Sequence, residues 1–225
     1  MLIPIVTGLA AGSLHVVTGP DHLAAVAPIA LRDPLRAARV GAAWGLGHGL
    51  GVAALGGLGM IAREAVDISG LSGWSEFSVG FLLVGLGLWS LRAALKMQVH
   101  GHEHAHDGEV HLHPHVHLGD GAHDAGSHQG HTHTAFGIGV FHGAAGMGHL
   151  LGVVPALALP AAQSAAYLVA YLFAAVLSMA GFGFLLGQLG RRAGPRPLRA
   201  MLVAAACFTL VVGVGWLATT FPGVA

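Results

Sequence analysis

Six apolar runs, each long enough to cross a lipid bilayer, constrain this chain more than any other feature. A membrane-spanning helix needs about 20 predominantly apolar residues, and it satisfies its own backbone polar groups within lipid. Only 9% of the 225 residues are charged and 54% are hydrophobic, which is unlike a soluble domain. We therefore predict an all-α integral membrane protein with six transmembrane helices, near residues 3–31, 37–62, 77–98, 135–160, 165–190 and 198–221.

The basic residues lie almost entirely on one side of these predicted spans. Nine of the ten Lys and Arg residues lie near the C-terminal ends of the first, third and fifth spans or in the loops that follow them, and only Arg63 lies on the opposite side. Short loops that carry an excess of Lys and Arg stay in the cytoplasm. This bias predicts a multi-pass protein of the cell (inner) membrane, with both termini outside.

Residues 100–133 differ in composition from the rest of the chain, because they contain twelve histidines in 34 positions. By the charge bias this low-complexity segment is cytoplasmic, and we expect it to be disordered without metal. Imidazole is the commonest transition-metal side chain, so loose metal buffering is favoured over a plain hydrophilic linker. Eight of these histidines alternate with other residues: His100, His102, His104, His106, His111, His113, His115 and His117.

A sequence repeat relates the two halves of the chain. A shift of 127 residues aligns residues 12–28 with 139–155, and seven of the seventeen positions match, including two histidines. Each copy begins a set of three predicted helices, so the odd number of crossings inverts the second set, as in many secondary transporters. We predict two inverted three-helix repeats, residues 1–98 and 135–225, joined by the loop at 99–134, with the first and fourth helices broken or irregular.

Several histidines and one aspartate lie inside the predicted spans, where ionisable residues mark substrate paths. His15 and His22 are about 10 Å apart along an unbroken helix, too far for one ion with bonds of about 2 Å. Gly19 and Pro20 predict a helix break that brings them together. A nitrogen-rich site with one carboxylate suits Ni²⁺, Co²⁺ or Zn²⁺ as a transported substrate, without a prosthetic group. The predicted ligands are His15, Asp21, His22, His48, His142 and His149.

The motif His15-x3-Gly19-x-Asp21-His22-Leu23 resembles the first-helix motif of the nickel/cobalt permease superfamily, most closely the branch that accompanies urease and hydrogenase. Gly47-His48 is similar to the next motif of that family, and the His-rich loop is similar to that of its efflux members. The resemblance implies transport of Ni²⁺ or Co²⁺ with His15, Asp21, His22 and His48 as ligands, with uptake slightly favoured over efflux. It also implies a cytosolic metallochaperone or metalloenzyme-maturation protein as a candidate partner, beside the ion and the bilayer.

Three other functions stay open at this point. A membrane-embedded metalloenzyme could use the same histidines, although the sequence has no His-Glu-x-x-His motif. A zinc permease of another family, or a membrane-tethered metal store or sensor, would also explain the His-rich loop. Balanced charge, with ten basic and ten acidic residues, favours no nucleic-acid partner. We therefore predict a membrane metal-ion transporter and not an enzyme.

Overall fold

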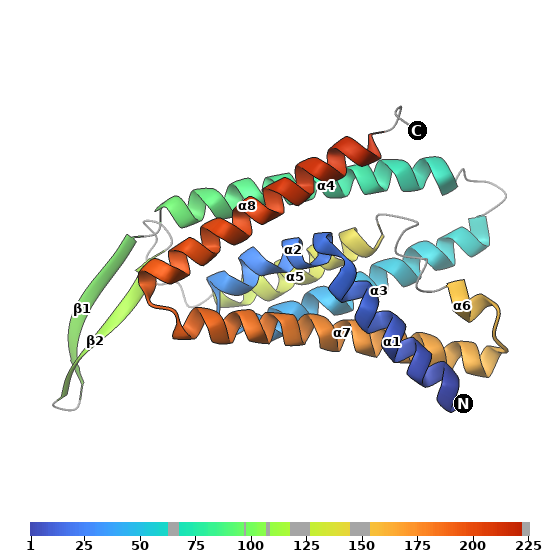
Figure 1. Cartoon of the computed structure of the whole chain (residues 1–225), viewed down its shortest axis with the longest axis horizontal. Helices are drawn as coiled ribbons and strands as arrows, with labels where there is room; N and C mark the ends of the chain where they lie inside the picture. Colours follow the sequence, from blue (N-terminus) through green and yellow to red (C-terminus); the bar gives the residue numbers. More distant parts are fainter. Residues whose placement is uncertain (63–67, 97, 107–108, 118–126, 145–153, 222–225) are drawn as a thin grey trace.

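The computed structural model describes residues 1–62, 68–96, 98–106, 109–117, 127–144 and 154–221. These residues form eight helices and one pair of strands (Figure 1). In chain order the elements are α1 (Leu2–Thr18), α2 (Pro20–Arg32), α3 (Ala37–Ala62), α4 (Ile68–Lys96), β1 (Gln98–His106), β2 (Glu109–His117), α5 (Ser127–Gly143), α6 (Val154–Leu157), α7 (Ala161–Arg192) and α8 (Pro195–Thr220).

The first apolar run consists of two helices that meet at Gly19. The backbone of Gly19 is extended, with φ −83° and ψ 100°, and α1 and α2 are bent by 71° relative to each other. Pro20 takes the first position of α2, where its missing N–H has no helical partner to lose. The bend therefore directs the end of α1 and the start of α2 into one region of the bundle.

Glycines let the helices that surround this region approach closely. A Cβ at Gly139 or Gly143 on α5 would collide with the backbone carbonyl of Trp44 or His48 on α3. A Cβ at Gly12 on α1 would likewise collide with the carbonyl of Tyr171 on α7. Small residues allow such backbone contact between membrane helices, so α5 and α1 each pack against a neighbour without intervening side chains.

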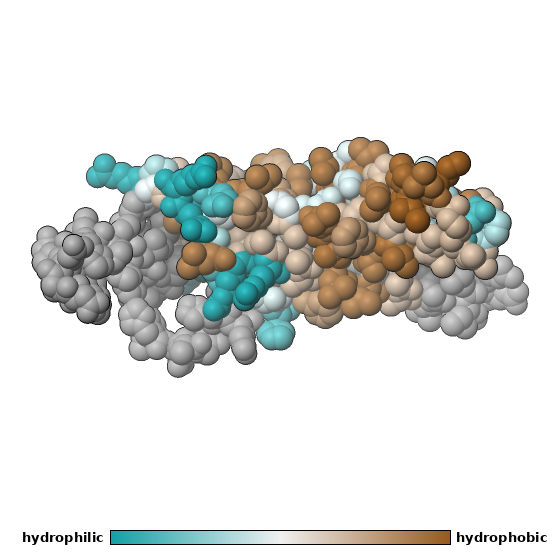
Figure 2. Space-filling model, turned by 90° about the horizontal axis from the view of Figure 1, so that it is seen from below, coloured by the Kyte–Doolittle hydropathy of each residue, from teal (hydrophilic) through white to brown (hydrophobic). Residues whose placement is uncertain are grey.

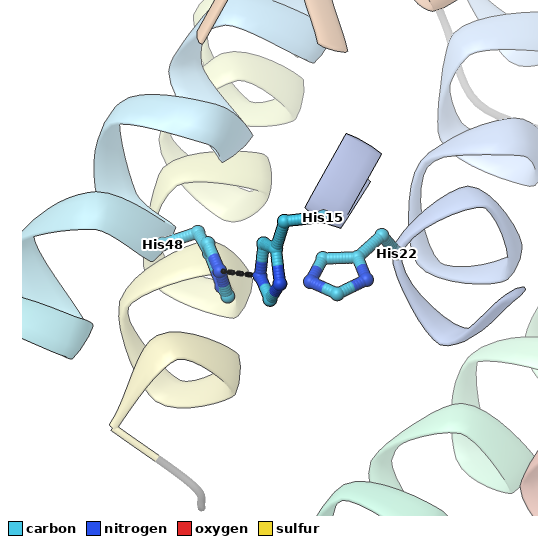
Figure 3. A group of neighbouring side chains, drawn as sticks. All are labelled: His15, His22 and His48. Atoms are coloured by element: carbon cyan, nitrogen blue, oxygen red, sulfur yellow. Dashed lines mark hydrogen bonds between the residues drawn. The ribbon is translucent and has the colours of Figure 1, made fainter. Parts of the chain in front are cut away.

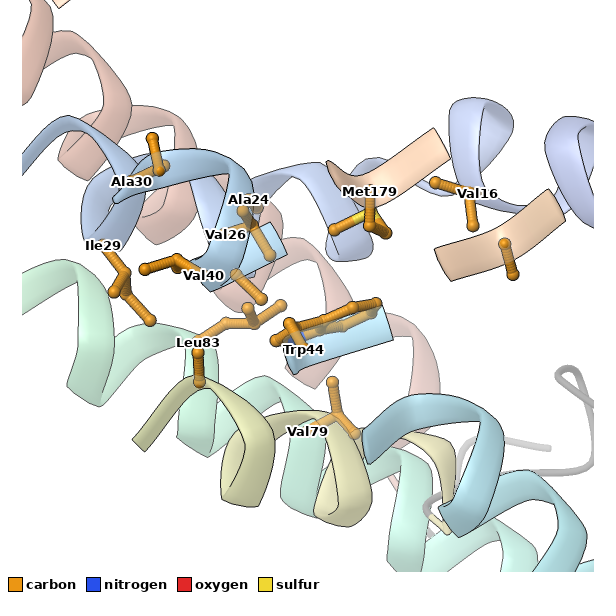
Figure 4. Packing of buried hydrophobic residues seen from close by; sticks show 14 residues of the cluster. Val16, Ala24, Val26, Ile29, Ala30, Val40, Trp44, Val79, Leu83 and Met179 are labelled. Atoms are coloured by element: carbon orange, nitrogen blue, oxygen red, sulfur yellow. The ribbon is translucent and has the colours of Figure 1, made fainter. Parts of the chain in front are cut away.

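The main core lies where α2, α3, α4 and α7 come together, around the fully buried Trp44 (Figure 4). Val16, Ile29, Leu83 and Met179 line the same cluster. The outer surface is also apolar, as shown by Val169, Phe173 and Val211, each more than 60% exposed. In Figure 2 hydrophobic residues cover the middle of the visible face, and hydrophilic residues gather mainly toward one end. Such a surface suits contact with lipid.

The structure supports fewer membrane spans than the sequence predicts. Within the described residues three helices are long and apolar enough to cross a bilayer, or four if the bent α1 and α2 form one broken span. The helix α5 has only 17 residues, short of the about 20 that a membrane span needs. Six spans arranged as two inverted three-helix repeats are therefore not supported. The predicted side of each terminus depended on six crossings and fails with them.

The His-rich segment also differs from the expected disordered loop. Its backbone forms an antiparallel pair of strands, β1 and β2, and α5 already begins at Ser127, eight residues before the predicted span at 135. In the register of this pair His100 lies opposite His115, and His102 lies opposite His113. The alternation of histidine with other residues matches the two-residue period of a strand, which explains the difference. Apart from this hairpin the described chain is helical.

Candidate metal site

Five of the predicted site residues lie together at the break between α1 and α2. His15 comes from the last turn of α1, and Asp21 and His22 come from the first turn of α2. His48 projects from α3 and His142 from the end of α5. The bend at Gly19 brings the first three residues together, and the glycine contacts between α3 and α5 bring the other two to the same place.

Three imidazoles from three helices form the first part of this cluster (Figure 3). The Nε2 atoms of His15 and His48 lie 3.2 Å apart, and the ring of His22 lies with its centroid 4.7 Å from that of His15 and 4.9 Å from that of His48. Figure 3 shows a nitrogen of His22 pointing toward the His15 ring. One nitrogen from each of the three residues falls within 4.8 Å of the other two.

Asp21 joins the second part of the cluster to His22. Its Oδ1 lies 3.1 Å from Nδ1 of His22, and its Oδ2 accepts a hydrogen bond of 2.9 Å from Nε2 of His142. Asp21, His22 and His142 form a second group of ligand atoms within 4.8 Å of one another. Asp21 lies in the first turn of α2, where the helix dipole favours a negative charge. His22 therefore belongs to both groups.

The cluster is almost completely shielded from solvent. Asp21, His22, His48 and His142 are each at most 3% exposed, and His15 is half-buried. Burial of this many polar groups costs free energy unless they are paired with each other or with an ion. His15 is therefore the point at which the cluster approaches the surface of the bundle.

Two aromatic residues form walls of the site, and sequence reasoning did not select either of them. The indole of Trp44 stacks on His48, with ring centroids 5.0 Å apart and planes 7° apart, and it also contacts His22 and His142. The ring of Tyr171 lies 5.8 Å from that of His15. Trp44 precedes His48 by four residues, so the helical i, i+4 spacing is the signal that pointed to this contact. Tyr171 carries no comparable signal.

The donor set and its spacing fit a transition-metal ion. At a tetrahedral ion with metal–nitrogen bonds of about 2.0–2.1 Å, two ligand nitrogens lie about 3.3 Å apart. The separation of 3.2 Å between the Nε2 atoms of His15 and His48 is close to this value. Three imidazoles without a thiolate favour a borderline divalent ion over Cu(I), Mg²⁺ or Ca²⁺.

The remaining predicted residues are not placed in this cluster. His149 lies outside the described residues, so its role stays a prediction. The eight alternating histidines of the loop belong to strands β1 and β2. Their metal buffering also stays a prediction.

Comparison with curated proteins finds two similar sequences, both from Arabidopsis thaliana. Chloroplast protein FOR GROWTH AND FERTILITY 2 is 29% identical in an alignment 224 residues long that covers 96% of this chain and 56% of that protein. Chloroplast protein FOR GROWTH AND FERTILITY 1 is 40% identical over 89 residues, which are 39% of this chain and 24% of that protein. The chain thus spans little more than half the length of one relative and about a quarter of the other. No family model and no solved structure matches the chain.

These comparisons correct three predictions. The relatives are named as chloroplast growth and fertility proteins, and nothing in them points to the nickel/cobalt permease superfamily, so that membership is wrong. The prediction of Ni²⁺ or Co²⁺ transport, which depended on the resemblance and on the repeat, is wrong for the same reason. The cell inner membrane is wrong as the location, because the relatives are named as chloroplast proteins and the part of the chain that the structure describes has three or four candidate spans in place of six. The short motif around His22 was too small a part of the chain to identify a family.

Proposed function

We propose that this chain is a membrane-integral protein that binds one divalent transition-metal ion through His15, His22 and His48. The observation that carries the proposal is the meeting of three ligand nitrogens, from α1, α2 and α3, within 4.8 Å inside the bundle. Three successive helices supply these ligands, so the ion would also tie α1 to α2 and α3. The names of the relatives describe growth and fertility and add no ligand to this proposal.

Burial supports a role for these residues beyond helix packing. An isolated histidine in a core is usually satisfied by one hydrogen bond, but here His22 and His48 are 2% exposed and share their surroundings with His142 and an aspartate. In the absence of an ion, the short contact between His15 and His48 requires one Nε2 to donate and the other to accept. Both Nε2 atoms need a free lone pair to act as ligands, so ion binding requires the donating histidine to carry its ring proton on Nδ1 in place of Nε2.

The arrangement leaves room for exchange at the ion. Three histidine ligands occupy three positions of a tetrahedral ion, and a fourth position is then available to water or another small ligand, as in catalytic zinc sites. We assign no reaction to this position, and the expectation that the chain is not an enzyme stays a prediction. Half-buried His15, on the separate helix α1, lies on the side from which an ion would enter.

The direct test is Zn²⁺ binding by the detergent-solubilised protein after chelator treatment, followed by a competing dye or by calorimetry. The alternating histidines of β1 and β2 are replaced by glutamine in every sample, so that they contribute no binding. We expect one equivalent of Zn²⁺ in this background and a loss of at least a hundredfold in affinity in His22→Ala and His48→Ala. His133→Ala, which changes an exposed histidine of α5, is the matched control. Equal binding by all four proteins would disprove the site.

We also infer that the two halves of the chain arose from one duplicated unit, without the six crossings. The support is a pair of equivalent helix contacts, in which each residue of one contact lies 127 positions from its equivalent in the other. Gly12 lies against the carbonyl of Tyr171, and Gly139 lies against the carbonyl of Trp44. A shift of 127 converts residue 12 to 139 and residue 44 to 171, so α1 packs on α7 as α5 packs on α3.

An inverted duplication requires α1 and α5 to point in opposite directions through the membrane. Cys207 is first replaced by alanine, and single cysteines are then placed at Leu2, at the start of α1, and at Gln129, its counterpart near the start of α5 under the shift of 127. We expect a membrane-impermeant thiol reagent to label these two positions from opposite sides of oriented vesicles. Labelling from the same side would refute the inverted duplication but would leave the metal site untouched.

A further inference from the structure

Asp21 is a candidate ligand by residue type, but the geometry around it describes a different role. Both oxygens of its carboxylate are engaged by histidines, Oδ1 at 3.1 Å from Nδ1 of His22 and Oδ2 at 2.9 Å from Nε2 of His142. A carboxylate only accepts hydrogen bonds, so Nε2 of His142 must carry the proton in this contact. The nitrogen that His142 directs at the cluster is therefore a donor, which cannot bind a metal at the same time.

The position of Asp21 also determines which nitrogen of His22 can serve as a ligand. A carboxylate beside Nδ1 favours the tautomer with its proton on that nitrogen, which leaves the lone pair on Nε2. Figure 3 shows the His22 nitrogen that lies away from its own helix directed at His15. Metal-bound histidines commonly contact a carboxylate through the nitrogen that is not bound to the metal.

Charge favours one ion over two in this cluster. A divalent ion among three neutral imidazoles places two positive charges in a buried region, and Asp21, 3% exposed, supplies one compensating negative charge nearby. A second ion among Asp21, His22 and His142 would add two positive charges with no further carboxylate in either described ligand group. It would also require His22 to lose the protons from both ring nitrogens.

We propose that Asp21 and His142 do not bind the ion but act as a positioning pair for it. Asp21 holds His22 with Nε2 toward His15 and His48 and supplies the negative charge, while His142 holds Asp21 from α5. The pair thereby connects the ligands of the first half of the chain to a helix of the second half. This inference rests on the proposed metal site at His15, His22 and His48.

The experiment compares Zn²⁺ affinity and stoichiometry, and the visible absorption of bound Co²⁺ as a probe, in the background without hairpin histidines. The variants are Asp21→Asn, which removes the charge, and His142→Phe, which removes the donor and keeps a ring. Thr209→Val is the matched control, because it removes a different buried hydrogen bond to α2, from Thr209 Oγ1 to the Ala24 carbonyl. We expect one ion per chain in every protein and affinity about 10- to 100-fold lower in the two site variants.

The Co²⁺ bands separate the positioning role from direct ligation. Because the three ligands are unchanged, Asp21→Asn and His142→Phe are expected to keep the band positions of the parent protein at saturating Co²⁺. Shifted bands in either variant would make that residue a ligand, and two ions per chain in the parent would make Asp21, His22 and His142 a second ion position. Unchanged affinity in both variants would also overturn the inference. If the parent protein binds no ion, the proposed function itself has failed.

Discussion

The Nε2 atoms of His15 and His48 lie 3.2 Å apart, although the two residues are 33 positions apart and lie on different helices. Two structural features make this contact possible. The break at Gly19 turns α1 by 71° away from the direction of α2, and glycines on α1 and α5 bring the surrounding helices into backbone contact. The site is thus a product of helix packing, and changes in the packing glycines are expected to change it.

Gly143→Ala should destabilise the bundle. A Cβ at this position would collide with the carbonyl of His48, so α5 would have to move away from α3. Overpacking of this kind costs about 1–3 kcal/mol, which should appear as a lower thermal unfolding temperature in detergent. Gly137→Ala on the same helix is the control, because a Cβ there meets nothing within 4 Å, and it should be neutral or slightly stabilising. Equal effects of the two changes would contradict the close packing of α5 on α3.

The sequence predicted the cluster better than it predicted the fold around it. Ionisable residues stand out in apolar runs because their burial is costly, so His15, Asp21, His22, His48 and His142 could be selected without a structure. The proline at position 20 is a local signal that a helix begins there. Both inferences depend on the chemistry of single residues, which needs no knowledge of the neighbouring helices.

The number of spans and the state of the His-rich segment could not be predicted in the same way. The repeat predicted an irregular fourth helix, but hydropathy alone does not show that α5 ends at Gly143. The alternating histidines were interpreted by composition, although their period of two and the Asp107-Gly108 dipeptide between them are hairpin signals. The stacking of Trp44 on His48 depends on the rotamers of both side chains, which the sequence does not specify.

Trp44 should matter both for stability and for the site. It is fully buried, and it stacks on His48 while contacting His22 and His142. Trp44→Ala is expected to lower the free energy of unfolding by about 3–5 kcal/mol, because it leaves a large cavity. The freed space would also let His48 change rotamer, so Zn²⁺ affinity should fall. Trp74→Ala is the control, since Trp74 is 60% exposed. A comparable loss of Zn²⁺ affinity in that variant would contradict the role of Trp44 in holding the site.

Gly19→Ala should weaken metal binding more than it weakens the fold. The φ of Gly19 is −83°, which any residue adopts, so the substitution introduces no backbone strain. Its Cβ would instead collide with Nδ1 of His22, which would displace the imidazole from its position beside Asp21. We expect the affinity for Zn²⁺ to fall by at least about tenfold. The unfolding temperature should change little. Gly181→Ala, where a Cβ meets nothing within 4 Å, should leave the affinity unchanged.

Thr209 and Pro28 should be energetically coupled across the contact between α8 and α2. Pro28 has no N–H, so the carbonyl of Ala24 lacks its helical donor. The hydroxyl of Thr209 lies 2.8 Å from this carbonyl and also 2.8 Å from the carbonyl of Ala205 on its own helix, so its one proton is shared between these two acceptors. Thr209 is fully buried, and removal of its hydroxyl in Thr209→Val should cost about 1–3 kcal/mol because the carbonyl is left without a donor. Thermal unfolding of the single variant in detergent measures this cost.

The coupling is measured with a double-mutant cycle that adds Pro28→Ala. The alanine restores a backbone N–H four residues after Ala24, so the helix can again satisfy that carbonyl by itself. Thr209→Val should then cost much less in the Pro28→Ala background than in the parent, with a coupling of about 0.5–3 kcal/mol. If the two changes add independently, the hydroxyl of Thr209 does not replace the donor that Pro28 lacks, and the bond to the Ala24 carbonyl contributes little to the attachment of α2.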